Sequence, residues 1–379
     1  MDYKIYPVRS EKDLEDFTML PFDLYDKNSP WVAPLIGQYK KYISGEDNLL
    51  NYAGPHEKIL LRDGKRTIGR LIVGINEELN KYHGLKEAYI SQFESIEDIE
   101  AARLLLGFAE NWAKKRGMTL IKGPLSLPGG DDNRGFLIDN FQAPVYVMNT
   151  YNKPYYNDFF LDFGFVKYFD CYGYEADLVE EALDRYKKAI PRLMKRFNYR
   201  LDKVNLKDKK ALAKDADDIK RIIEEAMPKD WLDFMPPSQE EIEGIVKQLV
   251  PFADGDLIFI ARSTIDNRPL GFNITLPDYN QVLKDMRGRL LPTGFVSFLL
   301  KKRKINRGRM LVLFVIPSYR NKGVSGAIYL ASQEEAQKKG YTRVEGSTIW
   351  EYNKEMLADI ESFGAERTKV YRIYTKDIL

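Results

Sequence analysis

The sequence has one cysteine, Cys171, and two histidines, His56 and His83, among its 379 residues. A single cysteine cannot form a disulfide within the chain, which favours a reducing compartment. The N-terminal residues show no apolar signal region, so we expect a cytoplasmic protein. So few cysteines and histidines exclude the clusters that usually bind zinc. A serine hydrolase would need one of the two histidines, and the sequence contains no G-x-S-x-G motif.

Excess charge and long apolar runs are also missing. Lys plus Arg (58) nearly equals Asp plus Glu (56), giving a net charge of +2. A nucleic-acid-binding protein usually has a stronger basic excess, so we expect no nucleic-acid partner. No apolar run approaches the roughly 20 residues that span a bilayer, so we expect no membrane span. With 44% apolar and 30% charged residues, the chain is long enough for two globular domains.

Two stretches of the sequence repeat one another. NWAKKRGMTLIKGPLS, from Asn111, and EEAQKKGYTRVEGST, from Glu334, share five residues at a constant offset of 223 positions. Each stretch is typical of a helix end, a glycine stop and a short strand. A β-hairpin precedes each one, with predicted turns at 63–64 and 266–267. The pattern indicates an internal duplication.

The duplication predicts an α/β (α+β) protein of two similar domains, each a mixed central sheet flanked by helices. We place them at 1–177 and 200–379, joined by a charged helical connector at 178–199. The second copy carries an insertion at 277–309, which we expect to be helical in two pieces. It could cover the core, form a lid over the acceptor channel or contact a membrane surface. The first copy carries extra residues around 131–133, which we interpret as a polar loop.

The stretch PSYRNKGVSGAIY at 317–329 follows the apolar run LVLFVI. A strand that turns directly into a helix start presents unpaired backbone N–H groups at the positive end of the helix dipole. Gly323 has no Cβ to obstruct a ligand, and Arg320 and Lys322 add positive charge. These features predict an anion site suited to a diphosphate. The spacing matches neither the P-loop nor the dinucleotide-binding G-x-G-x-x-G motif.

The run Arg320-Asn321-Lys322-Gly323-Val324-Ser325 resembles the [QR]-x-x-G-x-[GA] turn of the Gcn5-related N-acetyltransferase (GNAT) superfamily, with serine in the last place. The order of elements over 200–379 is similar to that superfamily. NSPWVAPL (28–35) and KVYRIYTKDI (369–378) resemble bacterial proteins with two such domains. The resemblance implies that acetyl-CoA or another acyl-CoA binds here and that its acyl group passes to an amine. The acceptor would be a small molecule or a peptide.

The resemblance also implies the residues that contact the cofactor. Backbone groups of the strand before the turn would hold the pantetheine and the thioester carbonyl, in a gap left where the next parallel strand splays away. An asparagine that opens the following helix would lie near the sulfur, although an ordinary helix N-cap is an equal alternative. The expected contacts beyond the turn are therefore Leu313, Phe314, Val315 and Asn353.

The catalytic groups are less well defined by the pattern. Many GNAT proteins have a tyrosine seven residues after that asparagine, as the acid that protonates the departing thiolate, and this chain has Ile360 there. Tyr352 and Tyr371 are candidate replacements, with core or surface roles as the alternative. Glu345 is a candidate base, with a solvated or paired carboxylate as the alternative.

The first copy provides an internal comparison. Shifting by 223 positions puts Glu97 and Glu100 where the second copy has Arg320 and Gly323. Such an acidic helix start would repel a diphosphate, so we predict a degenerate first copy and one cofactor site per chain. Two alternatives to an N-acetyltransferase stay open, a catalytically silent acyl-CoA-binding or scaffold protein and a Fem-type aminoacyl transferase. The intact turn argues against the second. The sequence also leaves a homodimer open.

Overall fold

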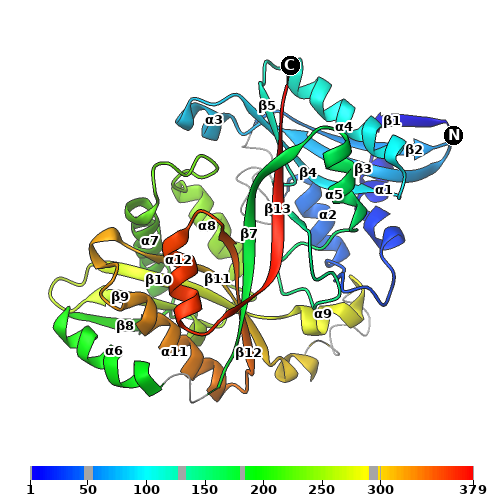
Figure 1. Ribbon diagram of the computed structural model, residues 1–379. Helices are drawn as coiled ribbons and strands as arrows, with labels where there is room; N and C mark the ends of the chain where they lie inside the picture. Colours follow the sequence, from blue (N-terminus) through cyan, green and yellow to red (C-terminus); the bar gives the residue numbers. More distant parts are fainter. Residues whose placement is uncertain are drawn as a thin grey trace. The chain divides into compact units, whose positions relative to one another are not determined.

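The computed structural model describes residues 2–46, 54–126, 134–179, 184–289, 298 and 300–378. They form two compact units (Figure 1). Unit 1 comprises Met1–Cys171, Asn280–Lys302 and Lys369–Leu379. Unit 2 comprises Tyr172–Tyr279 and Arg303–Thr368. Each unit is described by itself below.

The first half of the chain contains strands and helices in an order that the second half repeats. Its elements are β1 (Tyr3–Pro7), α1 (Glu11–Leu24), α2 (Ile36–Ser44), β2 (His56–Asp63), β3 (Arg66–Gly74), α3 (Glu77–His83), β4 (Glu87–Ser95), α4 (Ile99–Lys114), β5 (Leu120–Gly123), β6 (Phe136–Leu137), α5 (Tyr155–Asp162) and β7 (Val166–Asp177).

The second half runs from α6 to β13. Its elements are α6 (Asp184–Arg196), β8 (Tyr199–Lys203), α7 (Lys209–Ala226), α8 (Gln239–Leu249), β9 (Phe259–Ser263), β10 (Pro269–Pro277), α9 (Asn280–Met286), β11 (Arg307–Val315), α11 (Val324–Lys338), β12 (Arg343–Trp350), α12 (Lys354–Ser362) and β13 (Glu366–Asp377). The order strand, helix pair, hairpin, strand, helix, strand, helix, strand occurs twice, as the predicted duplication requires.

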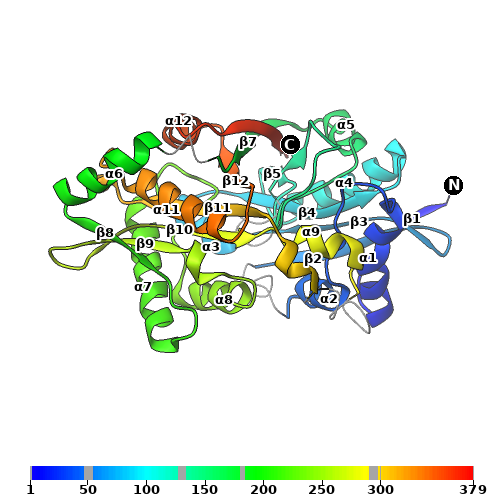
Figure 2. The same ribbon diagram turned by 90° about the horizontal axis from the view of Figure 1, so that it is seen from below.

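The strands of the two halves of the sequence repeat the same pairing. β2, β3 and β4 are antiparallel neighbours and β4 pairs with β5 in parallel. β9, β10 and β11 are likewise antiparallel, and β11 pairs with β12 in parallel. Figure 2 shows α6 and α11 on one face of the sheet of unit 2 and α7 and α8 on the other. The predicted mixed sheets flanked by helices are confirmed.

Local sequence signals explain where the outer helices start. Ser10 and Ser238 each form a capping box with an acidic residue three positions later, and Asp208 caps α7. Gly340 ends the helix region after α11 with a φ of +81°, as expected for a glycine stop. No helix in the described ranges is long and apolar enough to cross a membrane.

The compact units divide the chain differently from the predicted domains, because the last strands are exchanged between the two halves of the sequence. β13 pairs with β5 in unit 1, from Tyr374 opposite Gly123 to Asp377 opposite Leu120. The end of β7 belongs to unit 2, where Leu178 N–H donates to the carbonyl of Thr342, the residue just before β12 (2.9 Å). β5 and β12 would otherwise leave an open sheet edge, and the exchanged strands pair these edges.

The predicted connector and most of the predicted insertion belong to compact units other than expected. Part of the connector packs into unit 2, and residues 280–302 of the insertion belong to unit 1. Helix α6, in the expected connector, packs into the core of unit 2 through Ile190. Helix α9, in the insertion, belongs to unit 1, where Asn280 Nδ2 donates to the carbonyl of Val145 (3.0 Å) and Ile36 N–H donates to the carbonyl of Gly288 (2.9 Å). The insertion's remaining predicted helix falls largely on 290–297 and 299, outside the described residues, as do 131–133.

Candidate active site

Unit 2 contains a pair of parallel strands that separate. β11 and β12 are paired from Arg307 opposite Arg343 to Met310 opposite Gly346. Both strands continue beyond this pair, β11 to Val315 and β12 to Trp350. Backbone N–H and C=O groups in the separated part of a parallel pair are free to bind a ligand. This divergence is the gap that the resemblance implied.

A helix with an uncapped start follows the separated end of β11. Gly323 is the N-cap of α11, with φ +78°, and no side chain in the described part of the chain accepts from the first turn. The N–H groups of Val324, Ser325 and Gly326 are therefore the first-turn donors without a partner in the helix. Together with the helix dipole they can bind an anion.

The basic side chains of the turn differ in how firmly they are held. Arg320 Nη2 donates to the carbonyl of Ala226 (2.9 Å), and Nη1 lies 3.4 Å from a carboxylate oxygen of Glu355. The ammonium of Lys322 lies 4.5 Å from the centre of the Tyr319 ring and is half-buried. Asn321 is exposed, with φ +59°. Arg320 thus braces the turn, and Lys322 has no carboxylate partner among the residues that the structure describes.

Gly323 serves a purpose that the sequence did not indicate. A Cβ at this position would lie 2.7 Å from Leu193 Cδ1 of α6 and 3.4 Å from the Tyr199 hydroxyl. The prediction that this glycine also makes room for a ligand stays a prediction. Gly323 is required by its left-handed backbone and by the packing of α6.

Ser325 departs from the glycine or alanine of the motif. Burial raises the pKa of the Asp359 carboxyl group on α12, and the Ser325 hydroxyl lowers it in part.

Asn353 is the N-cap of α12. Its Oδ1 accepts from Met356 N–H at 3.2 Å, which is the capping alternative considered for this residue. A contact between Asn353 and a cofactor stays a prediction.

Glu345 lies in a buried cluster at the closed end of the gap. It is opposite Arg309, whose Nε is 3.8 Å away, and it accepts a 2.5 Å hydrogen bond from the Ser347 hydroxyl. Its side chain has no exposed surface. The structure therefore places Glu345 among paired groups where the strands are still joined, so that this carboxylate is not free in the gap.

The candidate tyrosines belong to different compact units. Tyr371 belongs to unit 1, where it is buried and pairs with Leu137 of β6. Tyr352 belongs to unit 2, just after the separated end of β12, and is 40% exposed. Ile360, at the place of the usual tyrosine, is buried against Gly346 of β12. Of the candidates, only Tyr352 lies at the open end of the gap.

Unit 1 has the same strand arrangement, but its own groups occupy the donors. Asp98 caps α4, accepting from the N–H groups of Glu100 (2.9 Å) and Ala101 (3.4 Å). Ser95, at the end of β4, donates its N–H to the Tyr156 hydroxyl at 3.0 Å. The first-turn donors of α4 are thus satisfied within the chain, and a single cofactor site per chain stays a prediction.

A buried polar cluster lies beside these groups in unit 1. The hydroxyls of Tyr25 and Tyr156 both donate to one oxygen of Glu94, at 3.0 and 2.8 Å. Arg70, only 1% exposed, lies opposite Glu94 on β3, with 3.9 Å between Nη2 and Oε1. Burial raises the pKa of Glu94, and Arg70 and the tyrosine hydroxyls lower it in part. Sequence reasoning missed this cluster, because nothing in a strand pattern marks which charged residue faces inward.

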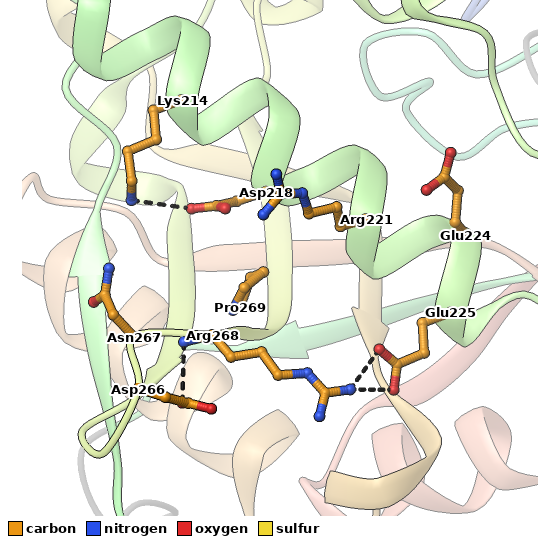
Figure 3. Close-up of a pocket in the computed structure, with 9 residues that line it drawn as sticks. All are labelled: Lys214, Asp218, Arg221, Glu224, Glu225, Asp266, Asn267, Arg268 and Pro269. Carbon is orange, nitrogen blue, oxygen red and sulfur yellow. Dashed lines mark hydrogen bonds and ion pairs between the residues drawn. The ribbon is translucent and has the colours of Figure 1, made fainter.

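A charged groove of about 720 Å³ lies elsewhere in unit 2, between α7 and the β9–β10 turn (Figure 3). Its side chains largely pair with each other, as Arg268 does with Glu225 (2.6 Å) and Lys214 with Asp218 (3.3 Å). It is not part of the predicted site, and mutual pairing leaves it little charge to offer a diphosphate.

Two known bacterial proteins are similar in sequence to nearly the whole chain. No protein-family model matches the chain. Protein YghO of Escherichia coli (strain K12) is 25% identical over 97% of the chain and 94% of its own length. A bacterial ceramide synthase of Caulobacter vibrioides is 25% identical over 99% of the chain and 97% of its own length.

The solved structure of a tandem GNAT protein from the clavulanic acid biosynthesis pathway matches the whole molecule. It covers 100% of this chain and 99% of its own, with a TM-score of 0.57 and 13% sequence identity. At 13% identity the similarity between the two proteins concerns the fold alone. One alignment covers both halves of this chain. The chain therefore has the fold of that tandem GNAT protein, with two similar α/β units built from one polypeptide.

Proposed function

We propose that unit 2 binds acyl-CoA and transfers its acyl group to an amine. The observation that supports this most directly is the contrast between helix starts. α11 begins at a glycine without a side-chain cap beside a separated parallel strand, whereas α4 is capped by Asp98. The name of the Caulobacter relative fits this class, because a ceramide is an N-acylated amine.

In this proposal, the first-turn amides of α11 and Lys322 hold the diphosphate, and the separated end of β11 holds the pantetheine through the backbone of Leu313, Phe314 and Val315. The remaining predicted contacts are Arg320, which orders the turn, and Asn353. The amine nitrogen attacks the thioester carbonyl, a C–N bond forms and the C–S bond breaks. The amine loses one proton and the thiolate gains one.

Replacing Lys322 by glutamate tests the diphosphate site. The change reverses a charge beside the uncapped amides, so we expect the Kd for CoA to rise at least about tenfold. Isothermal titration calorimetry with CoA measures this. Lys338→Glu makes the same charge change in the last turn of α11 and should leave the Kd within about twofold. Equal Kd values for both variants and the unaltered protein would contradict the assignment.

We propose Tyr352 as the group that protonates the thiolate, because it is the candidate at the open end of the gap. Tyr352→Phe keeps the ring and removes only the hydroxyl. We expect kcat for CoA release to fall about 100-fold with the Kd for CoA unchanged, which is the usual size of a lost general acid. Thiol release in the presence of an amine measures kcat. A variant as active as the unaltered protein would exclude this role.

A catalytically silent acyl-CoA-binding protein is the second candidate, favoured by Ile360 in place of the usual tyrosine. It predicts CoA binding that Lys322→Glu weakens, with no thiol release for any amine. We propose the cytoplasm as the location, because the sequence has a single cysteine, which cannot form a disulfide within the chain.

A further inference from the structure

A cluster of aromatic rings lies at the open end of the gap in unit 2. Trp231 and Phe234, from the segment between α7 and α8, contact Trp350, with ring centres 4.7 and 5.4 Å apart. Tyr352 extends the cluster, 5.1 Å from Trp350 and 6.1 Å from Trp231. Two separate pieces of the chain, 231–234 and 350–352, therefore bring their rings together at one place.

The position of Trp350 connects this cluster with the gap. Trp350 is the last residue of β12. The parallel pairing of β12 with β11 ends four residues earlier, at Gly346 opposite Met310. At about 3.3 Å per strand residue, the ring cluster begins roughly 13 Å along β12 from the point of separation. A thioester held in the gap would direct a chain attached to it, or attached to the attacking amine, toward this end.

The cluster does not look like the interior of a sheet–helix core. Trp350 is buried, but Tyr352 is 40% exposed and Leu232, beside Trp231, is 41% exposed. The segment that carries Trp231 is rich in apolar residues and proline, reading WLDFMPP over 231–237. Large apolar side chains gathered at a partly exposed edge are characteristic of a ligand or interaction surface.

We propose that Trp231, Phe234 and Trp350 form one wall of a site for a hydrocarbon chain on one of the two reacting molecules. This inference rests on the proposed acyl transfer and extends it by naming a substrate class. The chain could belong to the acyl donor or to the amine, and its chemistry is the same in both cases. Burying each methylene against such a wall strengthens binding by up to about fourfold, because the contribution is roughly proportional to the apolar area removed from water.

The experiment has a donor arm and an acceptor arm, each below the micelle concentration of its ligand. In the donor arm, calorimetry gives the Kd of CoA, acetyl-CoA and octanoyl-CoA. In the acceptor arm, thiol release from acetyl-CoA gives the KM of ethylamine and of octylamine. We expect at least about a tenfold advantage of the eight-carbon ligand in one arm, and that arm identifies the molecule that carries the chain.

Trp231→Ala should remove most of this advantage while the Kd of CoA changes less than about twofold. Phe234→Ala is a second variant with the same expectation, should the tryptophan change impair folding. Ile245→Ala is the matched control, since this apolar residue is equally exposed (41%) but lies on α8, away from the ring-bearing segment 231–237 in the sequence, and it should retain the advantage. No length advantage in either arm, or an advantage that both ring variants keep, overturns the inference. Failure of CoA itself to bind would instead overturn the proposed function.

Discussion

Arg70→Met should lower the free energy of unfolding by about 3–5 kcal/mol at pH 7.5, because it leaves the buried Glu94 carboxylate without its cation. Arg70 also donates to the Phe17 carbonyl and stacks on the Phe17 ring, 4.7 Å from its centre. These contacts join α1 to β3, so their loss adds to the effect. Chemical denaturation monitored by fluorescence measures the change.

The pH dependence of the stability of Arg70→Met shows whether the loss comes from the unpaired charge of Glu94 or from packing. The pKa of Glu94 is already raised by burial and rises further without Arg70. A carboxyl group whose pKa is higher in the folded than in the unfolded chain destabilises the fold when it is ionised. The free energy of unfolding therefore falls as the pH rises above the pKa that this group has in the unfolded chain. We therefore expect the loss caused by Arg70→Met to be smaller at pH 5 than at pH 7.5. An equal loss at both values would indicate that packing alone is responsible.

Two further variants serve as controls for Arg70. Arg66→Met makes the same change at the exposed start of β3 and should alter stability by less than about 0.5 kcal/mol. Adding Glu94→Gln to Arg70→Met keeps an acceptor for Tyr25 and Tyr156 but removes the buried charge, and should restore more than half of the lost stability.

Gly271→Ala should reduce both stability and CoA binding. Gly271 lies on β10 opposite Val315, and a Cβ there would be 2.8 Å from the Phe314 carbonyl oxygen and 3.2 Å from Val324 Cγ1. The methyl group would press on the end of β11 and on the first residue of α11 together. We expect a loss of about 2–3 kcal/mol and a CoA Kd at least about tenfold higher.

Gly244→Ala is the matched control for this change. Gly244 is inside α8, and a Cβ there would meet nothing within 4 Å. This substitution should raise the free energy of unfolding by about 1 kcal/mol, because alanine is the better helix former, and should leave CoA binding unchanged. Thermal denaturation and calorimetry measure both variants. Were Gly271→Ala as stable as the unaltered chain, the close approach of β10 to the site would be refuted.

Much of the fold could be predicted because short stretches of neighbouring residues determine many of its turns, helix ends and strands. The hairpin turns, the glycine at 340 and the repeated helix–strand segments are each set by a few neighbouring residues. The exchange of last strands could not be predicted, because β7 and β13 have the same alternating pattern and either could pair with either edge.

The candidate site was predicted in part for the same reason. The turn at 320–325 is contiguous, so its spacing was visible in the sequence. The pairing of Glu345 with Arg309 joins residues on different strands and depends on register, which composition does not fix. Gly69 and Gly271 occupy equivalent places opposite Ser95 and Val315, but a lone glycine in a strand has no distinguishing neighbour.

The exchanged strands have a consequence for synthesis of the protein on the ribosome. The partner of β5 is β13, which lies at residues 366–377 and is therefore translated long after β5. Until then the nascent chain carries an unfilled strand position that another polypeptide could occupy. A variant that ends before Glu366 would keep that vacancy permanently and would be prone to aggregate, although it retains the whole turn at 320–325.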